Sequence, residues 1–224
     1  MTTTETPLAP IPEGAYIDEP VEFVYKGRRF RVELQFDHDA GPPQNECDGH
    51  GVITPARETP GHRYGNGPND VQGLAEAADD EPDFFAEELT DEDIAAAALF
   101  RELSSSQNCR ATGDVLWYDV LRTLQLAEKD GWGMDAAWHA EHPGATPAEI
   151  RMAAVERDFE YLSGWYNDDW CYVGVVVTLL TEPDEDDETE EVDTTSCWRF
   201  ESTDTEGQNE YVRDAVEELL RSNP

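Results

Sequence analysis

A thiol and an imidazole lie three residues apart in the segment Glu46-Cys47-Asp48-Gly49-His50-Gly51. A cysteine and a histidine at this spacing can supply two of the ligands that a structural zinc ion takes. No second cysteine is paired with a histidine at a matching spacing. Cys47 and His50 are therefore weak metal candidates, and a turn built on Asp48-Gly49 is the preferred interpretation.

The same two side chains, Cys47 and His50, also suggest a thiol nucleophile with its base. Such a nucleophile must be a thiolate, and an acidic environment disfavours that form. Magnesium-dependent nuclease chemistry would need a cation beside paired carboxylates, but Lys26 and Lys129 lie far from any paired acids in the sequence. We therefore expect a protein that is not an enzyme and that needs no cofactor.

Charge is the strongest constraint on function. The chain has 224 residues, of which 51 are aspartate or glutamate and only 15 are lysine or arginine, so the formal net charge is -36. A field of this sign repels nucleic acids, nucleotides and anionic membranes, and it attracts cationic surfaces. We therefore expect a basic nucleic-acid-binding protein or complex as the partner, with no direct binding to nucleic acid or membrane.

Abundant carboxylates have a second explanation. Proteins of salt-accumulating organisms are acidic and poor in lysine, because hydrated surface carboxylates keep them soluble. Composition does not reveal whether the carboxylates share one surface, so both explanations stay open. A calcium-binding role is disfavoured, because the sequence has no Asp-rich loop with a central glycine and a terminal glutamate.

The carboxylates gather in clusters, which are the candidate partner-binding residues. These residues are Asp79, Asp80, Glu81, Asp83, Glu87, Glu88, Asp91, Glu92, Asp93, Glu182, Asp184, Glu185, Asp186, Asp187, Glu188, Glu190, Glu191 and Asp193. Carboxylates on a helix face or loop rim can imitate a row of phosphates, because a helical turn rises about 5.4 Å and the charges of one DNA strand are spaced by about 3.4 Å. A single cluster is more simply interpreted as a solvated loop. Taken together, the clusters make mimicry of DNA as probable as adaptation to salt.

Two pairs of strands are expected to form the framework. Residues 1–20 contain four prolines and form an extended arm that enters the first strand. Alternating residues predict strands over 21–25 and 28–36, joined by a turn at Lys26-Gly27. Residues 170–180 are β-branched or aromatic nearly throughout, which is typical of a strand covered on both faces, and residues 196–201 form its partner.

Helical spacing of apolar residues predicts helices from residue 90 to about 103, over 114–130 and over 206–221. The strongest start signal is Thr146-Pro147-Ala148-Glu149, which combines an N-cap, a proline at the first helical position and a capping-box glutamate. This order of elements predicts an α+β fold, in which an antiparallel sheet of two hairpins is packed by about four helices and carries an acidic inserted segment.

Residues 21–224 are expected to form a single α+β domain, with an irregular and acidic insertion at about residues 57–113. Residues 1–20 lack the basic and apolar stretches of a secretory leader, and no apolar run is long enough to cross a membrane. Four cysteines at irregular spacing do not form a disulfide framework of the secreted kind. We therefore expect a cytoplasmic protein.

Four segments carry a resemblance to a known family. They are Glu46-Cys47-Asp48-Gly49-His50-Gly51-Val52, Glu128-Lys129-Asp130-Gly131-Trp132-Gly133, Asp158-Phe159-Glu160-Tyr161-Leu162 and the stretch of residues 165–178. The family they resemble comprises uncharacterised proteins of bacteriophages and other mobile elements. The resemblance covers roughly residues 21–52 and 114–221, and the segment between departs from the pattern. The family has no known activity, so the resemblance implies only a setting, a small accessory protein inside a bacterial host.

In that setting the charge suggests a phage accessory protein that mimics double-stranded DNA. It would block the basic DNA-binding site of a host defence complex, as an anti-CRISPR or anti-restriction protein does. The alternative is a non-enzymatic accessory or structural protein whose acidity serves only solubility or salt adaptation. A zinc protein built on Cys47 and His50 is the third hypothesis. The oligomeric state and the identity of the host complex are left open by the sequence.

Overall fold

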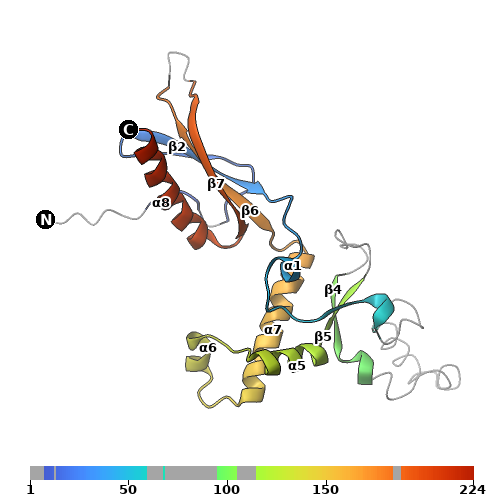
Figure 1. The fold of residues 1–224 in the computed structure, drawn as a ribbon. Helices are drawn as coiled ribbons and strands as arrows, with labels where there is room; N and C mark the ends of the chain where they lie inside the picture. The colour runs from blue at the N-terminus through green and yellow to red at the C-terminus, as the bar shows by residue number, and fades with distance from the viewer. Residues whose placement is uncertain (1–7, 13, 60–67, 69–94, 105–114, 184–187) are drawn as a thin grey trace. The chain divides into compact units, whose positions relative to one another are not determined.

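The computed structural model describes residues 8–12, 14–59, 68, 95–104, 115–183 and 188–224 (Figure 1). Their contacts cluster into two compact units. Residues 1–40 and 170–224 form the terminal unit, and residues 41–169 form the central unit. The sequence predicted one domain with an insertion at about residues 57–113, whereas the contacts group all of residues 41–169 together. The α+β class is confirmed.

The terminal unit contains a four-stranded antiparallel sheet in the order β1-β2-β6-β7. As predicted, β1 (Val21–Tyr25) and β2 (Arg28–Phe36) form one hairpin, and β6 (Tyr172–Leu180) and β7 (Glu191–Glu201) form the other. The prediction placed the start of the last strand at residue 196, whereas β7 begins at Glu191 because it pairs with β6 as far as Leu180. The dipeptide Lys26-Gly27 joins β1 to β2 with φ angles of 50° and 76°. Two successive left-handed residues are what a type I′ turn requires, so this turn sets the register of the hairpin.

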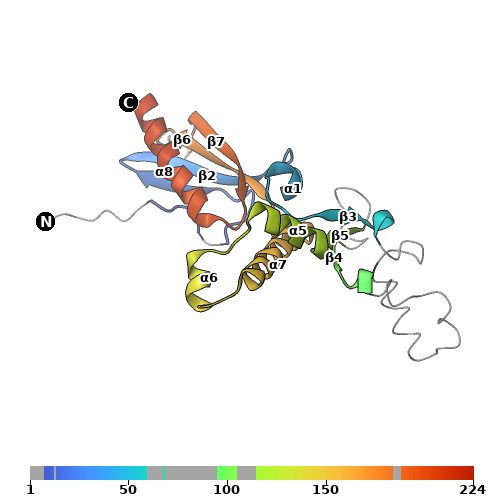
Figure 2. The same ribbon diagram turned by 60° about the horizontal axis from the view of Figure 1, so that its bottom comes forward.

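Helix α8 (Thr205–Ser222) packs along one face of this sheet, as both Figure 1 and Figure 2 show. Alternate residues of β2 and β6 point to that face and meet the apolar stripe of the helix. The buried core consists of Ile11, Phe30, Val32, Leu34, Val173, Val175, Val177, Leu179, Val212, Ala215, Val216 and Leu219. The opposite side of α8 is therefore left facing solvent.

The arm that precedes β1 is attached to α8 through Asn209. The backbone N–H of Ile11 donates to Asn209 Oδ1 at 3.0 Å, and Asn209 Nδ2 donates to the Ile11 carbonyl oxygen at 2.9 Å. Both residues are buried. Because the side-chain amide satisfies both backbone groups of Ile11, it holds this part of the arm as a strand would.

Replacing Asn209 with alanine is expected to release the arm and to lower the free energy of unfolding by about 1–3 kcal/mol, since two buried backbone groups lose their partner. Limited proteolysis measures the release, because cleavage near Ile11 should become faster. The control is Glu210→Ala at the exposed neighbouring position, which should change neither quantity. Equal cleavage rates in the two variants would show that Asn209 does not hold the arm.

The central unit contains a three-stranded antiparallel sheet in the order β3-β5-β4. Its strands are β3 (Ile53–Pro55), β4 (Phe100–Ser104) and β5 (Leu116–Asp119). The helices whose full bounds lie in the described ranges include α1 (Pro43–Glu46), η1 (Ala56–Glu58), α5 (Val120–Asp130), α6 (Ala136–Glu141) and α7 (Pro147–Tyr166). Among the helices of the described ranges, none combines the length and the apolar composition of a membrane span.

Two of the predicted helices are wrong in part, because β4 and β5 occupy their sequence. The helix predicted from residue 90 to about 103 gives way to β4 at Phe100, and the one predicted over 114–130 begins only after β5, at Val120. All four residues of β5 are buried, since this strand lies between β3 and β4. Burial on both faces favours β-prone residues such as Trp117 and Tyr118 in a strand, whatever their helical spacing.

The predicted start of α7 and the predicted end of α5 are confirmed. The Thr146 side chain accepts from the Glu149 backbone N–H while the Glu149 carboxylate accepts from the Thr146 N–H, which completes the capping box. Helix α5 ends at Gly131 in the left-handed conformation with φ 69°, and the next N–H, that of Trp132, donates to the Ala127 carbonyl. These two local signals place α7 and Trp132 at the edge of the cavity described below.

Candidate functional site

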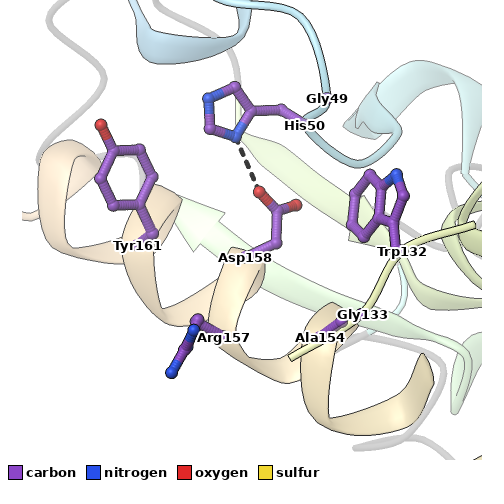
Figure 3. Close-up of a pocket in the computed structure, with 8 residues that line it drawn as sticks. All are labelled: Gly49, His50, Trp132, Gly133, Ala154, Arg157, Asp158 and Tyr161. Carbon is purple, nitrogen blue, oxygen red and sulfur yellow. Dashed lines mark hydrogen bonds and ion pairs between the residues drawn. The ribbon is translucent and has the colours of Figure 1, made fainter. Parts of the chain in front are cut away.

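His50 and Asp158 form a partly buried pair in the central unit. His50 lies in the loop between α1 and β3, and Asp158 lies in the middle of α7. His50 Nδ1 is 2.7 Å from Asp158 Oδ1, and the two side chains are only 15% and 9% exposed (Figure 3). The sequence predicted His50 as a candidate together with Cys47, but its partner in the structure is the carboxylate of a residue 108 positions away.

The second oxygen of Asp158 accepts two further hydrogen bonds. The Gly51 backbone N–H donates to Oδ2 at 2.8 Å, and the Tyr118 hydroxyl donates to the same atom at 2.8 Å. An ionised carboxylate can only accept hydrogen bonds, so the atom that faces it on His50 must be an N–H. The neutral ring therefore carries its proton on Nδ1 and exposes the lone pair of Nε2.

Tyr118 lies in β5 and is fully buried, which favours the protonated hydroxyl that donates to Asp158. Burial raises the pKa of its phenol, and the adjacent Asp158 carboxylate raises the pKa further. The hydroxyl therefore keeps its proton throughout the physiological pH range. Its ring stands edge-on to Phe159, whose other neighbour is the guanidinium of Arg101 at 3.5 Å from the ring centre.

The loop around His50 depends on two glycines. Gly49 has a φ angle of 97°, a backbone conformation that residues with a Cβ atom rarely adopt. Gly51 lies so close to Tyr118 that a Cβ atom would be 2.5 Å from the hydroxyl oxygen and from the ring. The next residue, Val52, donates its N–H to Thr123 Oγ1 at 2.9 Å, which attaches the loop to the first turn of α5.

A cavity of about 450 Å³ opens beside the His50–Asp158 pair. Its lining consists of Gly49, His50, Trp132, Gly133, Ala154, Arg157, Asp158 and Tyr161 (Figure 3). Tyr161 stacks on the His50 ring at 5.4 Å with an angle of 8° between the planes. Arg157 is bound to Asp135 at 2.8 Å, so its charge is compensated. The walls are therefore mainly apolar, with few polar groups that face the space.

No model of a known protein family matches the chain, and no curated protein or solved structure matches it either.

The cysteine of the predicted zinc or thiol site does not join the pair. Cys47 is exposed, and it does not line the cavity. Within the described ranges, no group of three or more His, Cys, Asp or Glu side chains is arranged to hold a metal ion. His50 is therefore paired with the Asp158 carboxylate and not with the thiol that the zinc and nucleophile hypotheses assigned to it.

The acidic clusters are only partly described by the structure. The predicted residues from Asp79 to Asp93 and from Asp184 to Asp187 lie outside the described residues. The remaining predicted residues are exposed on or beside β7: Glu182, Glu188, Glu190, Glu191 and Asp193.

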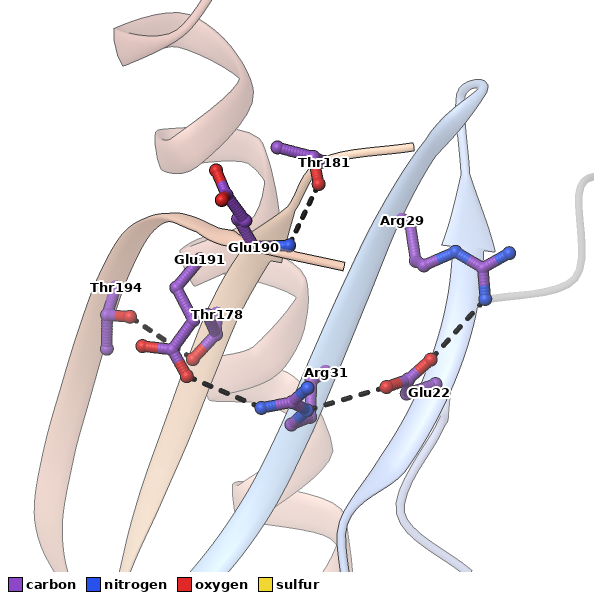
Figure 4. Close-up of polar contacts among 8 residues, drawn as sticks. All are labelled: Glu22, Arg29, Arg31, Thr178, Thr181, Glu190, Glu191 and Thr194. Atoms are coloured by element: carbon purple, nitrogen blue, oxygen red, sulfur yellow. Dashed lines mark hydrogen bonds and ion pairs between the residues drawn. The ribbon is translucent and has the colours of Figure 1, made fainter. Parts of the chain in front are cut away.

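One member of that group is compensated by a cation. Arg31 on β2 lies between Glu191, at 3.4 Å, and Glu22 of β1, at 3.5 Å (Figure 4). Arg29 adds a second contact to Glu22 at 3.4 Å. These residues alternate with the core residues of β2, so they lie on the face of the sheet opposite α8. That face carries paired charges, and Glu191 is poorly suited to bind a partner's cation.

The structure shows a row of carboxylates that the sequence analysis did not single out. Glu206, Glu210, Asp214 and Glu218 follow one another at every fourth position of α8, and all four are exposed. Consecutive members are separated by about 6 Å along the helix axis. We call these four residues the α8 acidic row. Their regular spacing on the face opposite the apolar stripe was visible in the sequence and could have identified them.

The α8 acidic row has no cationic partner among the residues that the structure describes. The two arginines of the helix bind carbonyl oxygens, Arg213 that of Leu8 and Arg221 that of Glu217. Like charges at this spacing each oppose helix formation by a few tenths of a kcal/mol. The row therefore reduces the stability of α8 and presents uncompensated charge on a rigid element.

Proposed function

We propose that this chain is an accessory protein that mimics double-stranded DNA and occupies the basic DNA-binding site of a host defence complex, in the host cytoplasm. The observation that carries the proposal is the α8 acidic row, four exposed carboxylates at regular spacing without a described cationic partner. A groove lined with lysine and arginine binds successive phosphates, and a regular row of carboxylates on a helix offers it a comparable series of charges.

The net charge of -36 supports the same proposal through association kinetics. A strongly negative protein is steered toward a cationic groove, and the association rate then falls steeply as salt rises. Solubility or salt adaptation is the competing function for the same charge. The two differ in one respect: mimicry depends on where the carboxylates are, whereas solubility depends only on how many there are.

A pair of variants with equal charge separates the two functions. The row variant combines Glu206→Gln, Glu210→Gln, Asp214→Asn and Glu218→Gln. The scattered variant combines Glu19→Gln, Asp39→Asn, Glu141→Gln and Glu160→Gln, four exposed positions without a described ion pair. Each variant removes four negative charges, which changes the net charge from -36 to -32.

The measurement is capture of proteins from a bacterial lysate at low salt, followed by elution with duplex DNA. We expect the immobilised chain to retain a DNA-binding complex that duplex DNA releases, and to retain it less as salt rises from about 50 to 200 mM. The row variant should bind that complex about 30-fold more weakly, from four contacts of about 0.5 kcal/mol each. The scattered variant should bind like the wild type. Equal weakening in both variants would favour the solubility explanation instead.

A further inference from the structure

The cavity beside His50 lies within the central unit and takes no part in the proposed mimicry, which rests on α8. We infer that this cavity binds a small, neutral, planar aromatic molecule that carries an N–H or O–H donor, and that His50 Nε2 accepts the hydrogen bond from it. This would be a second binding function of the chain, for a small molecule.

The polarity of the site follows from the hydrogen bonds of Asp158. Its Oδ2 is occupied by the Gly51 N–H and the Tyr118 hydroxyl, and its Oδ1 faces His50 Nδ1. In the neutral ring Nδ1 is therefore the protonated nitrogen, and Nε2 is left as an acceptor. No described residue donates a hydrogen bond to Nε2. Because His50 lines the cavity, a ligand bound there lies beside the ring and can supply the donor that Nε2 lacks.

The size and walls of the cavity specify the rest of the ligand. About 450 Å³ suits a molecule of one or two fused rings. Trp132, Ala154 and Tyr161 supply apolar and aromatic surface, against which a planar ring gains dispersion and stacking energy. The polar group at the centre of this surface is the His50–Asp158 pair, so one directed hydrogen bond would orient the ligand.

The charges around the cavity favour a neutral ligand. Arg157 is the cation among the lining residues, and it is already bound to Asp135 at 2.8 Å. The lining includes the carboxyl group of Asp158, and the net charge of -36 on the chain as a whole repels anions. An anionic ligand would therefore meet no uncompensated cation in the lining, while a neutral heterocycle avoids the repulsion altogether.

The first test uses indole, which is planar and neutral and has one N–H donor, with 1-methylindole as its matched control. Titrations of the full chain are followed by NMR, through the amide signals of Gly51, Trp132 and Tyr161 and through the ring nitrogens of His50. Indole should saturate these shifts, and 1-methylindole should bind about tenfold more weakly because it leaves Nε2 without a donor. His50→Phe should bind the two molecules equally. Failure of indole to shift these signals, or equal binding of both molecules to the wild type, overturns the inference.

The second test reverses the polarity of the site. In Asp158→Asn the amide oxygen can still accept from Gly51 and Tyr118, which turns the amide N–H toward His50 Nδ1. Nδ1 then becomes an acceptor and Nε2 becomes an N–H donor. The wild type should prefer indole to quinoline, whose ring nitrogen is an acceptor, and the variant should prefer quinoline. An unchanged preference in the folded variant overturns the proposed role of Nε2, and the comparison of indole with 1-methylindole decides the question if this variant does not fold.

Discussion

Replacing Asp158 with alanine is expected to lower the free energy of unfolding of the central unit by about 3 kcal/mol or more. Three donors lose their acceptor at once: His50 Nδ1, the Gly51 N–H and the Tyr118 hydroxyl. Each buried donor that is left without a partner costs about 1–3 kcal/mol, although neighbouring losses do not add fully. The Tyr118 hydroxyl of β5 also lies 3.3 Å from the Val155 carbonyl, which is a weaker acceptor at that distance.

Denaturant unfolding followed by tryptophan fluorescence measures this effect, and hydrogen exchange in α7 assigns it to the central unit. Glu160→Ala, at an exposed position of the same helix, is the control and should remain within about 0.5 kcal/mol of the wild type. Asp158→Asn should cost less than Asp158→Ala, because its amide oxygen keeps two of the donors satisfied. A loss below about 1 kcal/mol for Asp158→Ala would mean that these hydrogen bonds do not hold the loop to α7.

Replacing Gly51 with alanine is expected to cost about 1–3 kcal/mol and to disturb the cavity. The added methyl group would lie 2.5 Å from the Tyr118 ring and hydroxyl, and the fully buried ring has no space into which to move. Either the loop or the tyrosine must shift, and each shift breaks a hydrogen bond to Asp158. Thermal unfolding measures the stability, and the NMR signals of the His50 ring report the loss of its contact.

Gly133→Ala is the matched control for this prediction. Gly133 also lines the cavity, but a Cβ atom built there has no neighbour within 4 Å. Its φ angle lies outside the left-handed region, so alanine is tolerated and can raise the stability by a few tenths of a kcal/mol through the unfolded state. Similar destabilisation by both substitutions would show that the close approach of Gly51 to Tyr118 is not the cause.

The elements predicted correctly share one property, which is that their signals lie within a few consecutive residues. The Lys26-Gly27 turn, the capping box at Thr146 and the helix end at Gly131 are each completed by backbone groups no more than five residues away. A sequence pattern can report such features because the partners are present in the same short segment. The apolar stripe of α8 is local in the same sense.

The elements missed by the sequence depend on distant partners. The residues of β5 have an apolar spacing compatible with a helix, and only the flanking strands β3 and β4 make them a strand. His50 could be chosen as a candidate from its residue type alone. Its partner Asp158 could not, because it is one of 51 acidic residues in the chain. Nothing local distinguishes that carboxylate from the solvent-exposed ones.

The sequence by itself determined the α+β class, the two hairpins of the terminal sheet, the start of α7 and a net charge of -36. The tertiary structure alone decided that Asp158 joins His50, Gly51 and Tyr118, and that the acids of α8 are without a described cationic partner. The physical reason is the distance along the chain between the residues that interact. Turns and caps are set by neighbouring residues, whereas a buried carboxylate acquires its partners, and an exposed one its freedom, only when distant segments have packed.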